Sequence, residues 1–250
     1  MKCLILAAGY ATRLYPLTEN FPKPLLEVAG KPILDWLIED LEQGGQVSEY
    51  IIVSNHKFAD IFRKWIEGHT YKDKLSLVDD GSVSNESRLG AVRDIELGIR
   101  ARGINDDLLV MAGDNLLTFS LQGFLDYAVK KGTSCVMRFY QADLARLHKS
   151  GVAEVDENGK ILSMEEKPTN PKSHWCCPPF YFYKKDDLKM VDIGIAEGCE
   201  TDAPGSFIAW LCARRVVHAW EMPGKRLDIG NLESYEEAKK TFAALKYGKD

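Results

Sequence analysis

The chain has 250 residues, enough for one large α/β domain or two small ones with a sizeable core. Its 32 basic and 37 acidic residues leave a net charge of −5, which gives no electrostatic footprint for nucleic acid or an anionic membrane. No apolar run approaches the roughly 18 residues that span a bilayer, and the short apolar start lacks a signal-peptide pattern. With six dispersed cysteines, these features predict a cytoplasmic globular protein with reduced thiols, which binds neither nucleic acid nor membrane.

Short apolar runs rich in Val, Ile and Leu alternate with helical patterns along the first half. Strands buried on both faces are expected at 2–6, 50–54, 75–78 and 108–111. Helices are expected at 32–44, where a glycine pair ends an apolar stripe, and at 58–67, 89–100 and 121–131. The alternation predicts a three-layer, Rossmann-like α/β fold, with a mostly parallel, mixed sheet and helices on both faces. Ligand loops are then expected at the carboxyl ends of its strands.

The second half changes character. A hairpin is expected around Asn158-Gly159, because this pair is a strong turn signal between the apolar runs 152–155 and 161–164. An aromatic strand, a helix, another strand and a C-terminal helix are expected at 180–183, 186–196, 216–222 and 232–245. There is no internal repeat or linker. A single domain over 1–250 is therefore predicted, in which the second half supplies a lid or a substrate-facing subregion.

A small-residue turn follows the first predicted strand at Ala7-Ala8-Gly9, with Arg13 close behind it. Such a turn lets backbone N–H groups approach phosphates, and an arginine can clamp a phosphate with two hydrogen bonds. An ordinary strand-to-loop turn would use the same small residues. The prolines on either side stiffen the backbone at Lys23, whose charge can neutralise a polyphosphate. Taken alone, however, a lysine beside a proline favours a solvated surface residue.

Two carboxylates fall where an open α/β sheet positions catalytic groups. Asp114 comes just past the end of the predicted strand 108–111, and it is a hard oxygen ligand suited to Mg²⁺. The alternative is an aspartate that caps the next helix or turn. Asp228 can complete a metal site with Asp114. The run Glu165-Glu166-Lys167 is of a kind that is usually just solvated.

In chain order, the motifs are Leu6-Ala7-Ala8-Gly9-x-x-Thr12-Arg13-Leu14-x-Pro16-Leu17-Thr18, Pro22-Lys23-Pro24-Leu25-Leu26, Gly113-Asp114, Glu166-Lys167-Pro168 and Asp228-x-Gly230. Together they resemble the sugar-phosphate nucleotidyltransferase family, in the group of glucose-1-phosphate thymidylyltransferase and its uridylyl and cytidylyl relatives. The resemblance implies an enzyme that joins a nucleoside triphosphate and a sugar 1-phosphate to give a nucleotide-sugar and pyrophosphate, with Mg²⁺ as cofactor. It also implies that residues 1–120 form a nucleotide-binding half, and that 121–250 form a sugar-phosphate-binding half with a C-terminal helix.

The same resemblance implies a role for each motif residue. The nucleotide would be bound by Leu6, Ala7, Ala8, Gly9, Asn85, Arg88, Gly90 and Asp114. Mg²⁺ would be held by Asp114 and Asp228. The sugar phosphate would be bound by Gly151, Glu166, Lys167 and Tyr181. The catalytic cations would be Arg13, Lys23 and Lys167, because two anions must meet at the α-phosphorus. The histidines are interpreted as structural or surface groups.

The chain departs from the family pattern at several places. The segment 84–90 lacks the glutamine-containing stretch usual in thymidylyltransferases, so the base is left open. Arg226 stands where many relatives carry an aromatic residue, and Pro179 where a glycine is common, so the sugar is left open as well. No β-helix repeats are present, so an attached acyltransferase is not expected. For the assembly state, a homodimer is the hypothesis.

Three other functions fit parts of the pattern. A CTP-dependent cytidylyltransferase for phosphocholine or another phosphoalcohol would need an aromatic cage, for which the candidates are Tyr140, Trp175, Phe180, Tyr181 and Tyr183. A catalytically silent nucleotide-sensing module would not need both metal carboxylates. A dinucleotide-dependent oxidoreductase lacks its G-x-G-x-x-G fingerprint after the first strand.

Overall fold

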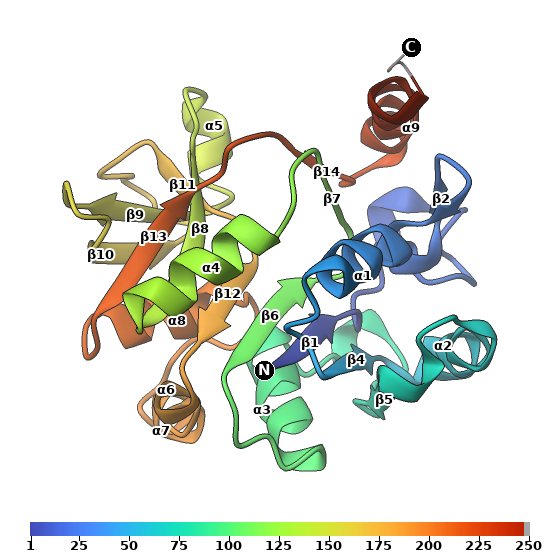
Figure 1. Ribbon diagram of the computed structural model, residues 1–250, viewed down its shortest axis with the longest axis horizontal. Helices are drawn as coiled ribbons and strands as arrows, with labels where there is room; N and C mark the ends of the chain where they lie inside the picture. The colour runs from blue at the N-terminus through green and yellow to red at the C-terminus, as the bar shows by residue number, and fades with distance from the viewer. Residues whose placement is uncertain (248–250) are drawn as a thin grey trace. The chain divides into compact units, whose positions relative to one another are not determined.

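The computed structural model describes residues 1–247, and its α/β fold is built on a ten-stranded mixed sheet (Figure 1). The strand order is β10-β9-β11-β8-β12-β6-β1-β4-β5, with β13 paired to β8. These strands are β1 Lys2–Leu6, β4 Glu49–Ser54, β5 Leu75–Asp79, β6 Leu108–Ala112, β8 Ser134–Tyr140, β9 Gly151–Val155, β10 Ile161–Glu166, β11 Trp175–Cys177, β12 Phe180–Tyr183 and β13 Val217–Glu221. The pairs β4–β5 and β8–β13 are parallel, whereas β12 runs antiparallel to both β6 and β8.

Two small sheets lie outside the main one. β2 Glu27–Val28 pairs with β3 Lys31–Pro32, and β7 Asn115–Leu117 pairs with β14 Arg226–Asp228, both antiparallel. The α-helices are α1 Ile33–Gly44, α2 His56–Gly68, α3 Ala91–Ala101, α4 Gln122–Lys131, α5 Leu144–Leu147, α6 Lys185–Leu188, α7 Val191–Ala196, α8 Gly205–Cys212 and α9 Leu232–Tyr247. Short 3-10 turns are η1 Thr12–Leu14, η2 Lys23–Leu25, η3 Lys72–Lys74 and η4 Asn85–Ser87. Within residues 1–247, no helix has the length and apolar character needed to cross a membrane.

This architecture confirms the predicted Rossmann-like α/β class with its mixed sheet. The predicted strands of the first half and the β9–β10 hairpin are present with nearly the expected bounds. The single helix predicted for 186–196 is wrong, because α6 ends at Leu188 and α7 begins at Val191. The physical reason is a tighter turn between them, in which the Met190 N–H donates to the Asp187 carbonyl three residues back.

The chain forms two compact units. Unit 1 comprises Met1–Leu4, Leu89–Met111 and Gly123–Met222. Its core includes the fully buried rings of Phe180, Phe182, Tyr183 and Phe207. Helix α8 packs on β10, and the antiparallel register of β9 and β10 sets Gly151 opposite Glu166. This register places Glu166 at the end of a strand and against the start of α8.

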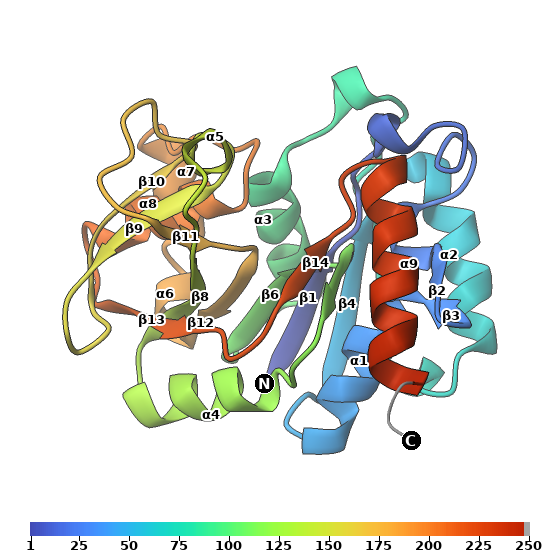
Figure 2. The same ribbon diagram turned by 90° about the horizontal axis from the view of Figure 1, so that it is seen from above.

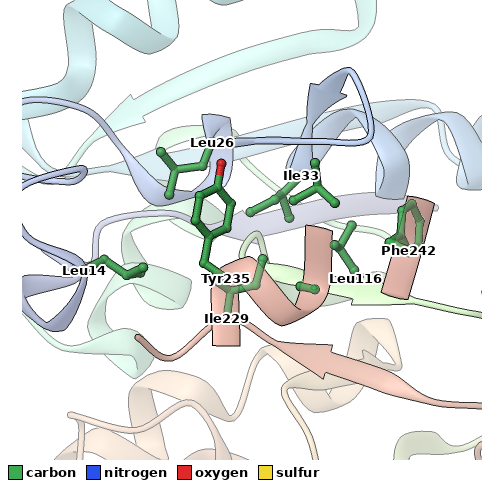
Figure 3. Packing of buried hydrophobic residues seen from close by; sticks show 9 residues of the cluster. Leu14, Leu26, Ile33, Leu116, Ile229, Tyr235 and Phe242 are labelled. Atoms are coloured by element: carbon green, nitrogen blue, oxygen red, sulfur yellow. The ribbon is translucent and has the colours of Figure 1, made fainter. Parts of the chain in front are cut away.

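Unit 2 comprises Ile5–Arg88, Ala112–Gln122 and Pro223–Asp250, of which 248–250 lie outside the described residues. Helix α9 packs alongside β14 and β2 within this unit (Figure 2). A buried cluster joins segments that are far apart in sequence (Figure 3), and its labelled members are Leu14, Leu26, Ile33, Leu116, Ile229, Tyr235 and Phe242. Three members, Leu14, Leu116 and Ile229, immediately follow Arg13, Asn115 and Asp228, so the core fixes the backbone beside these polar residues.

Candidate functional site

The turn after β1 lies in unit 2 and is held in place by two hydrogen bonds. The Ala7 N–H donates to the Val53 carbonyl over 2.9 Å, and Asn55 Nδ2 donates to the Ala8 carbonyl over 3.0 Å. The N–H groups of Ala8 and Gly9 donate to no acceptor within residues 1–247. Gly9 is exposed, and a Cβ there would meet nothing within 4 Å. The turn therefore offers backbone donors of the kind that bind anions.

Arg13 follows this turn on η1. Ala11 has a positive φ of 47°, and its carbonyl accepts from Thr18 Oγ1 over 2.8 Å, which holds the bend. Leu14 is buried and anchors the turn in the core, whereas the side chain of Arg13 is exposed. The guanidinium group forms no ion pair with any described residue, so it is available to an anion.

Lys23 and Asp114 are joined directly. Lys23 Nζ lies 2.6 Å from Asp114 Oδ2, and Lys23 is only 8% exposed although it is charged. Burial by itself would raise the pKa of the Asp114 carboxyl, but the charge of Lys23, with that of Arg226, holds this pKa below its usual range. Gly113 lets the backbone before Asp114 pack closely on β1 and on the residue after Lys23, since a Cβ there would lie 2.9 Å from the Ile5 side chain and 3.4 Å from that of Pro24. Asp114 is thus an ionised carboxylate already paired with a cation.

Asp228 is linked to Asp114 through the pairing of β7 with β14. In this register Asp228 lies opposite Asn115, the residue after Asp114. Asn115 is 1% exposed, and its Nδ2 donates to Asp114 Oδ1 over 2.9 Å. Arg226 Nη1 donates to Asn115 Oδ1 over 2.6 Å and lies 3.5 Å from Asp228 Oδ1. Lys23, both carboxylates, the amide and the guanidinium therefore form one connected chain of polar contacts.

The predicted base-reading residues divide between the two units. Asn85 and Arg88 belong to unit 2, where Arg88 Nη1 donates to Asn85 Oδ1 over 3.0 Å in an exposed segment. Gly90 belongs to unit 1, at the N-terminal end of α3, with φ +92°. A Cβ on Gly90 would lie 2.6 Å from the Thr201 carbonyl oxygen. This backbone contact requires glycine whether or not a ligand binds.

Glu166 and Lys167 lie in unit 1 at the end of β10. Lys167 has a positive φ of 48°, and its N–H donates to the Ser150 carbonyl over 3.0 Å. Two glycines make room for the Glu166 carboxylate: a Cβ on Gly151 would lie 2.9 Å from its Oε2, and one on Gly205 would lie 1.9 Å away. The Glu166 carboxylate accepts no hydrogen bond from the residues described, so it is open to a ligand's donors.

A pocket of about 480 Å³ opens beside these residues, lined by Glu166, Lys167, Cys199, Glu200, Ser206, Ala209 and Trp210. Glu200 is engaged, because its Oε2 accepts from Ser206 Oγ over 2.8 Å. Lys167 Nζ lies 3.8 Å from Asp202 Oδ2. Burial raises the pKa of Glu166 to about 7; the Lys167 charge opposes this rise and the Glu200 charge adds to it. The pocket thus combines a cation with a carboxylate that titrates near neutrality.

Tyr181 is 2% exposed on β12, where it pairs with Val110 and Val136. Its hydroxyl lies 3.3 Å from the position of a Cβ on Gly205, so only the tip of the side chain comes near the Glu166 region. The aromatic cage considered for a quaternary ammonium is wrong. Three of its five members, Phe180, Tyr181 and Tyr183, are buried in the core, because β12 is a central strand with both faces covered.

A second pocket, of about 510 Å³, lies in unit 2 and is lined by α1, residues 117–120 and Phe242. It contains none of the predicted site residues. Three residues that contact the predicted site residues were not predicted from the sequence. Asn115 contacts Asp114, whereas Glu200 and Gly205 lie beside Glu166. Asn115 could have been suspected because it directly follows Asp114, but the positions of Glu200 and Gly205 depend on tertiary packing.

Comparison with known proteins shows the family of the chain. A family model described as "Nucleotidyl transferase" matches residues 2–244, and the chain belongs to this family. A glucose-1-phosphate thymidylyltransferase of Mycolicibacterium smegmatis is 31% identical over 216 residues, which are 83% of this chain and 67% of the relative. The bifunctional protein GlmU of Methanocaldococcus jannaschii is 28% identical over 244 residues, 96% of this chain and 54% of the relative. The chain thus spans about half to two thirds of these curated relatives.

Solved structures share the fold. The crystal structure of a UDP-glucose pyrophosphorylase complexed with UDP-glucose superposes with a TM-score of 0.82 at 24% identity, and the match covers 100% of this chain and 99% of that one. At this identity the likeness establishes the fold alone.

Proposed function

We propose that the chain is a sugar-1-phosphate nucleotidyltransferase. A phosphate oxygen of the sugar 1-phosphate attacks the α-phosphorus of a nucleoside triphosphate in line, a new P–O bond forms, and the bond to pyrophosphate breaks. The nucleophile is already ionised, so this reaction needs no side-chain nucleophile. The observation that carries the proposal is the connected group of Lys23, Asp114 and Asp228 beside a turn with open N–H groups.

The chain's own residues would contribute to the reaction by electrostatic stabilisation. Two anions must approach each other, so positive charge held in place in advance lowers the barrier. The open N–H groups of Ala8 and Gly9 and the exposed Arg13 would take the triphosphate, and the buried Lys23 would face it. Lys167 would take the phosphate of the sugar 1-phosphate, while Glu166 accepts hydrogen bonds from sugar hydroxyls.

The residues present fit a divalent metal. The β7–β14 register sets Asp228 opposite Asn115, the residue after Asp114, and each carboxylate already has a cation beside it. Lys23 Nζ lies 2.6 Å from Asp114 Oδ2, and Arg226 Nη1 lies 3.5 Å from Asp228 Oδ1. Within residues 1–247 no cluster of three or more His, Cys, Asp or Glu forms a metal cage. Two carboxylates completed by phosphate oxygens and water is the usual arrangement for Mg²⁺. When bound there, Mg²⁺ would supply positive charge at the reacting phosphates.

The names of the relatives support the substrate class. A thymidylyltransferase and a uridylyltransferase for glucose 1-phosphate are among them, as is a putative mannose-1-phosphate guanyltransferase. These differ in base and sugar but share a sugar 1-phosphate acceptor, so we assign that class to this chain. No specific contact favours phosphocholine, since the aromatic residues considered for its cage are largely in the core.

Pyrophosphate release tests the proposal. With Mg²⁺, five nucleoside triphosphates are crossed with several sugar 1-phosphates and with phosphocholine. We expect strong pyrophosphate release from one pair of nucleoside triphosphate and sugar 1-phosphate. Release only from CTP with phosphocholine would replace the proposed acceptor, and no release from any pair would overturn the proposal. Asp114→Asn should lower turnover at least about 100-fold at any Mg²⁺ concentration. Because it also leaves the buried Lys23 without its carboxylate, the melting temperature should fall, and circular dichroism at the assay temperature must show that the variant is folded. The exposed Asp73→Asn is the matched control, and wild-type-like turnover of D114N would contradict the role of Asp114.

A further inference from the structure

Arg226 is a cation placed among the carboxylates that the proposed function assigns to the metal. Its Nη1 donates to Asn115 Oδ1 over 2.6 Å and lies 3.5 Å from Asp228 Oδ1. The side chain of Arg226 is only 17% exposed, so water screens its charge weakly. Through the Asn115 amide, whose Nδ2 donates to Asp114 Oδ1 over 2.9 Å, the same guanidinium is linked to the second carboxylate.

This arrangement has a consequence for metal binding. A divalent ion that approaches Asp114 and Asp228 meets a positive charge already beside them, and like charges at such short range oppose each other. The guanidinium must leave Asp228, or the ion must bind more weakly. A nucleoside triphosphate changes this balance, because its phosphates add negative charge to the site and offer Arg226 another partner.

We propose that Arg226 is a positioning residue that serves as the built-in counter-cation of the carboxylate pair. It holds Asp228 directly, and Asp114 through Asn115, in the arrangement that a metal requires, and it keeps the divalent-cation affinity of the free enzyme low. The metal then enters together with the nucleoside triphosphate. This inference rests on the proposed function, because it takes Asp114 and Asp228 as the metal carboxylates.

Titration of the nucleotide-free protein with Mn²⁺, followed by electron paramagnetic resonance, tests the proposal without any turnover. Arg226→Gln removes the charge and keeps a polar amide at this position. Arg226→Lys keeps the charge, and Lys225→Gln removes an exposed charge from the neighbouring position. We expect R226Q to bind Mn²⁺ about fivefold more tightly than wild type, whereas R226K and K225Q stay within about twofold.

The same titration with a non-hydrolysable nucleoside triphosphate should reduce the difference between R226Q and wild type. Should R226Q melt well below wild type, Arg226→Met is the second variant, since it fills the same space with an apolar chain. If R226Q, or R226M in its place, binds Mn²⁺ with the same affinity as K225Q, the role of Arg226 is overturned. The same holds if neither variant binds Mn²⁺. Tight binding by R226K as well would overturn it too, because loss of geometry rather than charge would then be the cause.

Failure of the proposed function would look different. Asp228→Asn should abolish the tighter Mn²⁺ binding of R226Q when the two changes are combined. Persistence of that binding would place the metal elsewhere and overturn both the metal assignment and this inference. Pyrophosphate release by the wild-type enzyme tests the reaction separately, so an unchanged R226Q titration with active wild type refutes Arg226 alone.

Discussion

Replacing Glu166 with Gln should change how the stability of the protein depends on pH. Burial raises the pKa of Glu166 from 4.5 to about 7, with Lys167 opposing the rise and Glu200 adding to it. Between these values the folded protein holds a proton that the unfolded chain has released. Stability therefore falls as pH rises from about 4.5 to about 7. Each pKa unit corresponds to about 1.4 kcal/mol, so the fall is at most about 3 kcal/mol, and less because the pocket is open to water.

The assay is urea unfolding of wild type and E166Q at pH 5 and pH 8, followed by circular dichroism. Gln cannot release a proton, so E166Q should gain about 2 kcal/mol relative to wild type on going from pH 5 to pH 8. Glu165→Gln is the matched control, since this neighbour is exposed, and it should follow wild type at both pH values. An equal stability difference between wild type and E166Q at both pH values would refute the assigned pKa and its cause.

Two further predictions concern glycines whose place in the structure leaves no room for a side chain. Gly205→Ala would set a Cβ 1.9 Å from Glu166 Oε2 and displace this carboxylate, so the KM for the acceptor should rise about tenfold with little change in the KM for the nucleotide. Gly68→Ala is the control, because a Cβ there meets nothing within 4 Å, and equal kinetics of the two variants would contradict the prediction. Gly90→Ala would set a Cβ 2.6 Å from the Thr201 carbonyl oxygen at φ +92°, and it should lower the free energy of unfolding by about 3 kcal/mol. A normal melting temperature of G90A with selective loss of nucleotide binding would instead favour a direct role of Gly90 in the base site.

Sequence periodicity predicted the elements that are long and fully buried. The apolar runs that form β1, β4 and β6 were recognisable because their residues are mostly buried on both faces. The run of β5 was recognisable as well, although this strand lies at the end of the sheet and is only partly buried. β8 was missed, because its sequence begins with Ser134 and includes a charged Arg138. The three-residue strands β7 and β14 are too short for any period to appear, and only their mutual pairing makes them strands.

The candidate site was predictable where short motifs follow strands, and less so elsewhere. Lys23, Asp114 and Asp228 were proposed from their motifs. The structure joins the first two in an ion pair and sets the third opposite Asn115, the residue after Asp114. The contacts of Asn115 and Arg226 depend on strand register between distant segments, which no local pattern reveals. The aromatic residues 180–183 could equally have lined a pocket or a core, and the central position of β12 decides for the core.

The β7–β14 pairing also sets an order of events during synthesis. Asn115 and Arg226 are separated by 111 positions in the chain, and their hydrogen bond belongs to a two-stranded sheet that has no other strand. Closing so long a loop costs conformational entropy before any contact rewards it. A nascent chain that has emerged as far as β7 therefore carries Asp114 without its partner carboxylate. Asp228 joins this chain of contacts only after β14 has left the ribosome and Ile229 has joined the core, so the proposed metal site would be completed late in folding.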